Sequence, residues 1–202
     1  MSETRQATCG AWSASTPTTR DDSDESLMLR YRHGDAAAFD TLYERHRGGV
    51  YRYLLRQSGD RSTAEELFQD VWMNLIRARE RYQPRAKFTT YLYRLAHNRF
   101  IDHCRRNAKR SSLADTSVGG HSEPIDPSPG PAETISGEET RQRFLAAVAD
   151  LPEVQREAFV LRQETGLGPD GIAEITGVNV ETAKSRLRYA VNRLKKTLRG
   201  VA

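Results

Sequence analysis

The pattern of apolar and polar residues divides the chain into two helical parts. In residues 27–60, apolar side chains recur at helical spacing and predict two helices. A broader apolar stripe in residues 60–82 predicts a third helix that is capped at Ser62 or Thr63 and ends before Pro84. A fourth predicted helix completes an N-terminal domain of about 80 residues, which is large enough to fold independently.

The pattern changes after this domain. Residues 107–136 hold four prolines, several Gly and Ser, and few apolar side chains, which is typical of a linker. Helical spacing then returns. A short apolar helix, Gly177 and a longer basic helix from Asn179 follow one another as in a helix-turn-helix, where the glycine takes the left-handed conformation of the tight turn.

The predicted fold class is therefore all-α: two small helical domains joined by a flexible acidic linker, with a helix-turn-helix in the C-terminal domain. The predicted divisions are a disordered extension at 1–26, a first domain at 27–107, a linker at 108–136 and a second domain at 137–202.

Charge is unevenly distributed, although the net charge is only +4. Residues 77–110 contain eleven Lys or Arg and two acidic residues, and residues 178–202 contain seven Lys or Arg and one acidic residue. Between them, residues 111–140 contain six acidic residues and no Lys or Arg. Two basic segments that flank an acidic one predict contact with a polyanion at two places.

The composition argues against several classes of protein. Cys9 and Cys104 form neither a disulfide framework nor a zinc motif, which favours a reducing compartment. No apolar run approaches a membrane span and the N-terminus is not a signal peptide, so we expect a cytoplasmic protein without membrane insertion. His97 and His103 do not line up with Cys104 as metal ligands, and neither an acid–base pair nor a phosphate loop occurs. We therefore expect no metal, no cofactor and no catalytic residue.

The basic helix from Asn179 is the first candidate binding element. Such a helix can be only a solvated face, but this one follows an apolar helix and a glycine turn. In a helix-turn-helix the first turns of this helix reach base edges, where Arg or Lys can bond guanine N7 and O6. The polar side chains clustered there are Thr182, Lys184, Ser185, Arg186, Arg188 and Tyr189.

Two further candidates lie in the N-terminal domain. Rings and cations alternate in residues 81–100, as in proteins that stack unpaired bases and hold their backbone, at about 1–3 kcal/mol for each base. The competing interpretation is that several of these rings belong to the core. The other candidate is the polar side of the helix at residues 66–78, which is either a solvated face or a partner surface.

Taken in order, these stretches resemble parts of bacterial sigma factors of the sigma-70 type, in the two-domain extracytoplasmic-function (ECF) group. "AEELFQDVWMNLIRA" is similar to the core-binding helix of region 2.2, and "FTTYLYRLAHNRFIDHCRR" to the promoter-melting segment of regions 2.3 and 2.4. The sequence from Leu151 to Lys196 resembles region 4. In this chain Tyr91 stands where the family usually has Trp, and Tyr189 and Val191 stand where Arg is common.

The resemblance implies a sigma factor that recognises minus-thirty-five and minus-ten promoter elements and helps to melt the DNA. The implied partners are core RNA polymerase (its β′ clamp helices and β flap), promoter DNA and a controlling anti-sigma factor. The residues implied at the polymerase are Glu66, Gln69, Asp70 and Asn74. Those implied at the minus-ten element, where a base flips out of the stack, are Arg81, Arg85, Lys87, Phe88, Tyr91, Arg94 and Asn98. Those implied at the minus-thirty-five element are the six polar residues of the basic helix.

Two other functions compete with this one. A stand-alone helix-turn-helix repressor or activator would have the basic helix, but it would not need the helix at 66–78 or the aromatic and basic cluster. An enzyme would need a catalytic constellation, for which the sequence offers no candidate.

Overall fold

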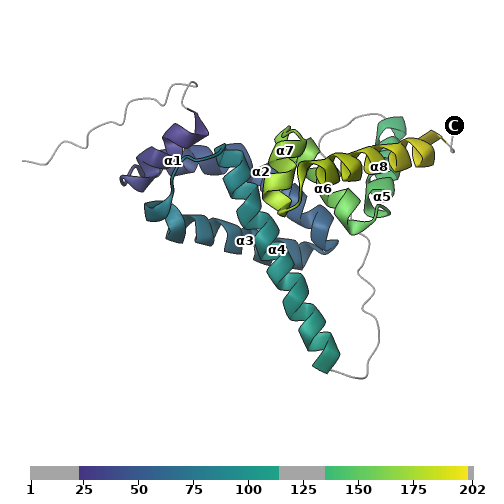
Figure 1. Cartoon of the computed structure of the whole chain (residues 1–202), viewed down its shortest axis with the longest axis horizontal. Helices are drawn as coiled ribbons and strands as arrows, with labels where there is room; N and C mark the ends of the chain where they lie inside the picture. The colour runs from purple at the N-terminus through teal and green to yellow at the C-terminus, as the bar shows by residue number, and fades with distance from the viewer. Residues whose placement is uncertain (1–22, 114–134, 200–202) are drawn as a thin grey trace, which may run out of the picture.

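The computed structural model describes residues 23–113 and 135–199, which form helices and short connections (Figure 1). The N-terminal half contains α1 (Asp24–Arg32), α2 (Ala36–Ser58), α3 (Arg61–Ala78), the short 3-10 helix η1 (Arg79–Arg81) and α4 (Phe88–Leu113). The C-terminal half contains α5 (Ile135–Ala149), α6 (Glu153–Thr165), α7 (Pro169–Thr176) and α8 (Val180–Arg199). Neither described range contains a strand. The predicted all-α fold class is confirmed.

Short polar side chains fix where the first three helices begin. Ser23, Asp35 and Asp60 precede α1, α2 and α3, and each accepts a hydrogen bond from the backbone N–H three residues later. The cap of α3 is therefore Asp60. Ser62 and Thr63, from which the sequence pattern predicted the cap, already lie inside the first turn.

The helices extend beyond the predicted boundaries at both ends of the linker and at the N-terminus. α1 begins at Asp24, inside the predicted extension, and α5 begins at Ile135, inside the predicted linker. α4 continues to Leu113, because residues 108–113 contain no proline or glycine that would stop it. The remainder of the predicted linker and extension lies outside the described residues.

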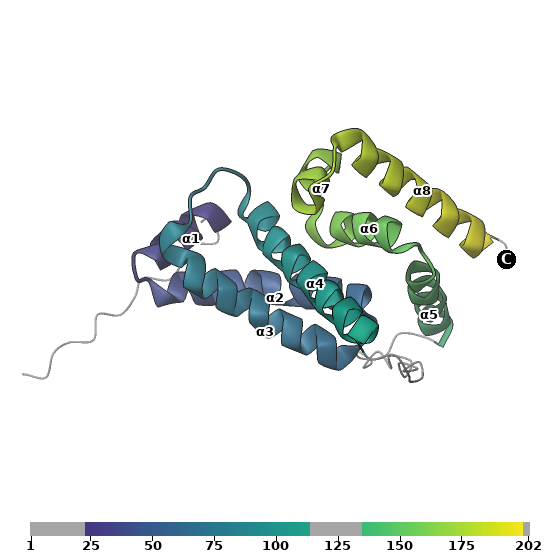
Figure 2. The same cartoon turned by 60° about the horizontal axis from the view of Figure 1, so that its bottom comes forward.

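In the N-terminal half, α2, α3 and α4 pack against one another, with α1 against α2 and the start of α4 (Figure 2). The leucines at positions 42, 54, 67, 75 and 92 are fully buried between them. Each such leucine is worth about 1.5–3 kcal/mol relative to an exposed one. This packing holds the start of α4 and the polar side of α3 in fixed positions.

In the C-terminal half, α8 packs its apolar stripe onto α6 and α7. Ala183, Ala190 and Leu194 form the buried side of α8. Gly177 ends α7 at φ 67°, the left-handed conformation that a residue with a Cβ rarely adopts. The predicted helix–turn–helix is thus present between Pro169 and Arg199.

The two halves contact each other directly, α6 on α2 and α7 on α4. α6 presents two carboxylates to this contact. The Tyr53 hydroxyl donates to Glu157 Oε1 at 3.0 Å, and His97 Nδ1 lies 2.6 Å from the same oxygen. The Arg56 guanidinium donates to Glu164 Oε1 at 2.8 Å, and the Glu164 side chain is only 5% exposed.

Candidate nucleic-acid and polymerase interfaces

The connection between η1 and α4 is a short arch of exposed residues held between two buried rings. Tyr82 is 3% exposed and Phe88 is fully buried, with their ring centroids 6.3 Å apart. Between them Gln83, Arg85 and Lys87 are exposed. The arch therefore presents cations and backbone to solvent while its ends are fixed in the core.

A stripe of polar side chains continues from the arch along α4. Tyr91, Arg94 and Asn98 follow at spacings of three and four, which places them on one side of the helix. Arg94 and Asn98 are exposed, and Tyr91 is half-buried with its ring 5.2 Å from that of Tyr82. Burial raises the pKa of the Tyr91 hydroxyl, so this ring remains neutral beside the cations.

Six of the seven residues predicted for the minus-ten element are thus at least partly accessible, in or beside the arch and along one side of α4. Arg81, beside the arch, is exposed as well. Phe88 lies instead inside the core, against His46 and Tyr82, and it anchors one end of the arch there. The competing interpretation, that some of the cluster's rings are core, holds for Phe88 and also for Phe100, which is 5% exposed.

The four residues predicted to contact polymerase lie on α3, on the side away from its apolar stripe. Glu66 and Gln69 are exposed and Asp70 is half-buried. Asn74 differs from the others, because its Oδ1 accepts a hydrogen bond from Arg99 Nη2 at 2.9 Å. Asn74 therefore ties α3 to α4 as well as bordering the surface.

Sequence reasoning missed one residue of this surface. Met73 is 46% exposed, three residues after Asp70 and seven after Glu66, so it lies on the same side of α3. The signal was an apolar side chain outside the apolar stripe. A flexible thioether among carboxylates and amides is typical of a protein-binding surface rather than of a solvated face.

The helix-turn-helix presents α8 with a well-defined start. The Asn179 side chain accepts from the Thr182 backbone N–H at 2.7 Å, which caps the helix. Glu181 then pairs with Lys184 at 2.7 Å, and this hydrogen bond, together with the charge of Glu181, raises the pKa of the Lys184 ammonium. Lys184 is therefore cationic at any physiological pH.

The six residues predicted to read the minus-thirty-five element all lie in the first three turns of α8, but on two flanks. Successive residues of a helix are turned by about 100°, so positions two apart lie about 200° apart. One flank carries Thr182, Arg186 and Tyr189, and the other carries Lys184 and Arg188, with Ser185 between them. The Arg188 guanidinium sits 5.3 Å from the centre of the Tyr189 ring and bridges the two flanks.

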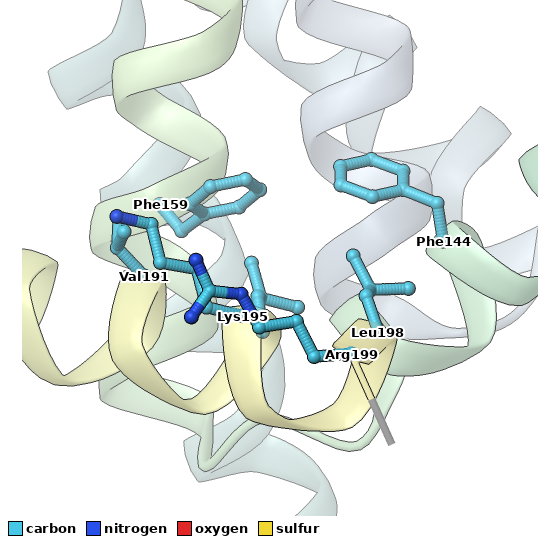
Figure 3. A pocket seen from close by; sticks show the side chains of 7 residues that line it. Phe144, Phe159, Val191, Lys195, Leu198 and Arg199 are labelled. Carbon is cyan, nitrogen blue, oxygen red and sulfur yellow. The ribbon is translucent and has the colours of Figure 1, made fainter. Parts of the chain in front are cut away.

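An apolar groove lies on the remaining side of the C-terminal half, between α5, α6 and the end of α8 (Figure 3). The rings of Phe144 and Phe159 form its floor, with centroids 6.2 Å apart. Val191 and Leu198, both at least one-third exposed, line it, and the cations of α8 stand at its rim. The lining residues are Phe144, Phe159, Val191, Leu194, Lys195, Leu198 and Arg199.

None of the described helices is both long and apolar enough to cross a membrane. Within the same residues, no group of three or more His, Cys, Asp or Glu side chains is arranged to hold a metal ion.

The chain is similar in sequence to known proteins over most of its length. The family model for sigma-70 region 2 matches residues 42–110, and that for sigma-70 region 4 matches residues 141–194. The ECF RNA polymerase sigma factor SigK of Mycolicibacterium vanbaalenii is 31% identical over 88% of this chain and 90% of the relative. The ECF RNA polymerase sigma factor RpoE of Cereibacter sphaeroides is 33% identical over 84% of this chain and 92% of the relative.

A solved structure has the same fold. It is the sigma factor RpoE of Bartonella quintana in complex with the anti-sigma factor NepR. The TM-score is 0.67 at 24% sequence identity, over 80% of this chain and 96% of that one.

The chain belongs to the sigma-70-type sigma factors, in the ECF group. Sigma factors are transcription initiation factors, so the chain is a DNA-binding protein that acts with core RNA polymerase at promoters. The family predicted from the sequence motifs is confirmed.

Proposed function

We propose that this chain is a dissociable promoter-specificity subunit with no catalysis of its own, acting in the cytoplasm together with RNA polymerase. The observation that carries the proposal is the exposed arch of residues 83–87 beside the stripe of Tyr91, Arg94 and Asn98. The cations can hold the backbone of a single strand, and the half-buried Tyr91 ring can stack on an unpaired base. A repressor that binds only duplex DNA does not need such a surface.

The other surfaces complete this assignment. The start of α8 reads the minus-thirty-five element in the major groove. The polar side of α3, with Met73 in its midst, contacts the β′ clamp helices. The apolar groove of α5, α6 and α8 accepts an apolar segment of the β flap, with Lys195 and Arg199 against acidic residues at its edge.

The proposed working units are a region 2 domain at residues 27–107 and a region 4 domain at 137–202. Their direct contact through α6 and α7 implies that they separate when each engages its own promoter element.

Run-off transcription with core polymerase tests the proposal. Core enzyme is incubated with a genomic fragment library, with and without the purified chain, and the transcript starts are mapped. The chain is expected to create defined start sites and to bind the same promoters poorly on its own. Absence of any new start site would refute the proposal. Tight, specific duplex binding without polymerase would favour a stand-alone regulator instead.

We also propose control by an anti-sigma factor, because the similar Bartonella quintana structure is of a sigma factor in complex with one. Affinity purification of the tagged chain from its native cells is expected to yield a small partner. That partner should abolish the new start sites when it is added to the run-off reaction. A co-purified protein without effect on transcription would not be the anti-sigma factor.

A further inference from the structure

Helix α1 holds both ends of the arch that joins η1 to α4. The Arg32 guanidinium, in the last turn of α1, donates from Nη1 to the carbonyl oxygen of Tyr82 at 3.1 Å. Glu25, in the first turn, accepts the backbone N–H of Phe88 on Oε1 at 2.6 Å. We call Arg32 and Glu25, with the bonds they make to the two ends of the arch, the brace. The two side chains are seven residues apart, so the brace spans about 10 Å along α1. Figure 2 shows the arch rising beside α1.

The bond from Phe88 to Glu25 supplies a cap that α4 cannot supply for itself. The residue before α4 is Lys87, whose side chain has donors but no acceptor. The first N–H groups of a helix need acceptors, and a carboxylate there also faces the positive end of the helix dipole. Glu25 therefore fixes the direction in which α4 begins, from a different helix.

Further contacts hold α1 itself in place. Asp24 accepts from Arg45 Nη1 at 2.9 Å and lies 2.6 Å from His46 Nε2. Burial opposes ionisation of Asp24, but these hydrogen bonds outweigh it and lower the pKa of the carboxyl. At the other end of the helix, the Arg79 guanidinium sits 5.8 Å from the centre of the Tyr31 ring. The brace is thus rigidly tied to both α2 and η1.

We propose that α1 is a positioning element for the promoter strand, and that Glu25 and Arg32 set the shape of the arch that receives the flipped base. Both side chains bond to backbone groups, Arg32 to the Tyr82 carbonyl and Glu25 to the Phe88 N–H, so each acts through the backbone it holds. This inference rests on the function proposed above and adds to it the residues that organise the base site. It also gives a role to residues 24–32, which lie before the matched region 2 segment.

The test uses holoenzyme and a promoter found by run-off transcription. Single-stranded oligonucleotides of the non-template strand, each with one minus-ten base replaced by an abasic site, identify the captured base in the wild type. Loss of that base is expected to weaken binding about tenfold or more. With Glu25→Ala or Arg32→Ala, the same replacement should matter less than about threefold. Affinity for core polymerase and for the abasic strand should be unchanged.

Two further variants sharpen the result. Glu25→Gln keeps an acceptor oxygen and should retain most of the discrimination. Glu44→Ala removes an exposed carboxylate that pairs with Arg47 on the surface of α2, and it should behave as the wild type. Full discrimination in both alanine variants would overturn the inference. So would a parallel loss of core affinity, which would mean that the brace only stabilises the fold. A wild-type chain that creates no start site would instead refute the proposed function.

Discussion

Arg186 stands on one flank of α8, with Thr182 and Tyr189, and is half-buried, so its guanidinium has fewer accessible orientations than that of a fully exposed arginine. An arginine held in this way can present its planar fork to guanine N7 and O6. Lys196, two to three turns later, is exposed and suits a phosphate. Truncation of Arg186 and truncation of Lys196 should therefore have different effects on promoter binding.

We expect Arg186→Ala to weaken promoter binding by about 1–3 kcal/mol and to relax base preference at one position of the minus-thirty-five element. Lys196→Ala should weaken all promoters equally and reduce the salt slope of binding by about one. Holoenzyme binding to a set of single-base promoter variants at several salt concentrations measures both effects. An unchanged base preference in Arg186→Ala would contradict this prediction and would indicate that the other flank of α8 contacts the bases.

The polar side of α3 gives a second prediction at this scale. Asp70→Ala and Met73→Ala should each weaken binding to core polymerase, Met73→Ala by about 1 kcal/mol or more if the thioether is buried in the complex. Both domains should remain folded, because neither side chain is in the core. Arg61→Ala, at the start of the same helix, is the matched control. Titration of labelled core enzyme measures the affinities, and wild-type values would exclude these residues from the interface.

At the scale of single helices, the N-cap of α3 is an ionisable residue, Asp60, so its contribution to stability depends on pH. Hydrogen bonds from the Thr63 side chain and backbone lower the pKa of Asp60 below its usual 3.8. Because the folded-state pKa is depressed, the cap stabilises the protein above pH 3.8, and this contribution is lost as the pH falls through the lowered value. Asp60→Ala should therefore cost about 1 kcal/mol at pH 7 and less at an acidic pH at which Asp60 is protonated in the folded protein.

Urea unfolding of wild type, Asp60→Ala and Ser62→Ala at the two pH values tests this prediction. Ser62 is exposed in the first turn of α3 and is the control for a general loss of helix propensity. If the cost of Asp60→Ala were the same at both pH values, a contribution other than the charged cap would be responsible.

At this scale, the sequence predicts features that depend on neighbouring residues and does not predict features that depend on contacts between distant ones. The apolar stripe of α3 and the glycine turn before α8 are local patterns, so both helices were predictable from spacing alone. Spacing left open which rings of the aromatic and basic cluster are buried, because the surroundings of Phe88 come from His46 and Glu25, about 40 and 60 residues away. The brace of α1 was invisible for the same reason. Its polar residues form an ordinary helix surface until the fold places α4 beside them.

If the two DNA-binding surfaces are those proposed above, the packing of the two described halves cannot serve both promoter elements at once. Elements named minus-thirty-five and minus-ten are about 25 base pairs apart, or about 85 Å at 3.4 Å per base pair. Helix α7, which leads directly into the reading helix, packs against α4, whose 26 residues span only about 39 Å from the arch. The two halves must therefore separate before both surfaces reach DNA.

Four contacts from the two carboxylates of α6 hold the halves together. Glu164 accepts from Arg52 Nη2 at 2.7 Å as well as from Arg56, and Glu157 is shared by Tyr53 and His97. Burial, and then the nearby Glu157 charge, raises the pKa of Tyr53 well above 10, so its hydroxyl stays protonated and continues to donate. Replacing both carboxylates by amides would remove the negative charge that Arg52 and Arg56 pair with, and it would give Tyr53 an uncharged, weaker acceptor. Separation of the halves would let water satisfy these groups instead.

We expect the double variant Glu157→Gln, Glu164→Gln to open the chain in solution. Its radius of gyration by small-angle X-ray scattering should rise. High salt should produce the same change in the wild type, because salt screens the pairs of Glu164 with Arg52 and Arg56, which the variant lacks. The opened chain should also bind minus-thirty-five duplex more tightly without polymerase. Glu139→Gln, which removes only an exposed pair with Arg143 on α5, should change neither quantity. Equal radii for wild type and double variant at low salt would mean that these carboxylates do not hold the halves closed.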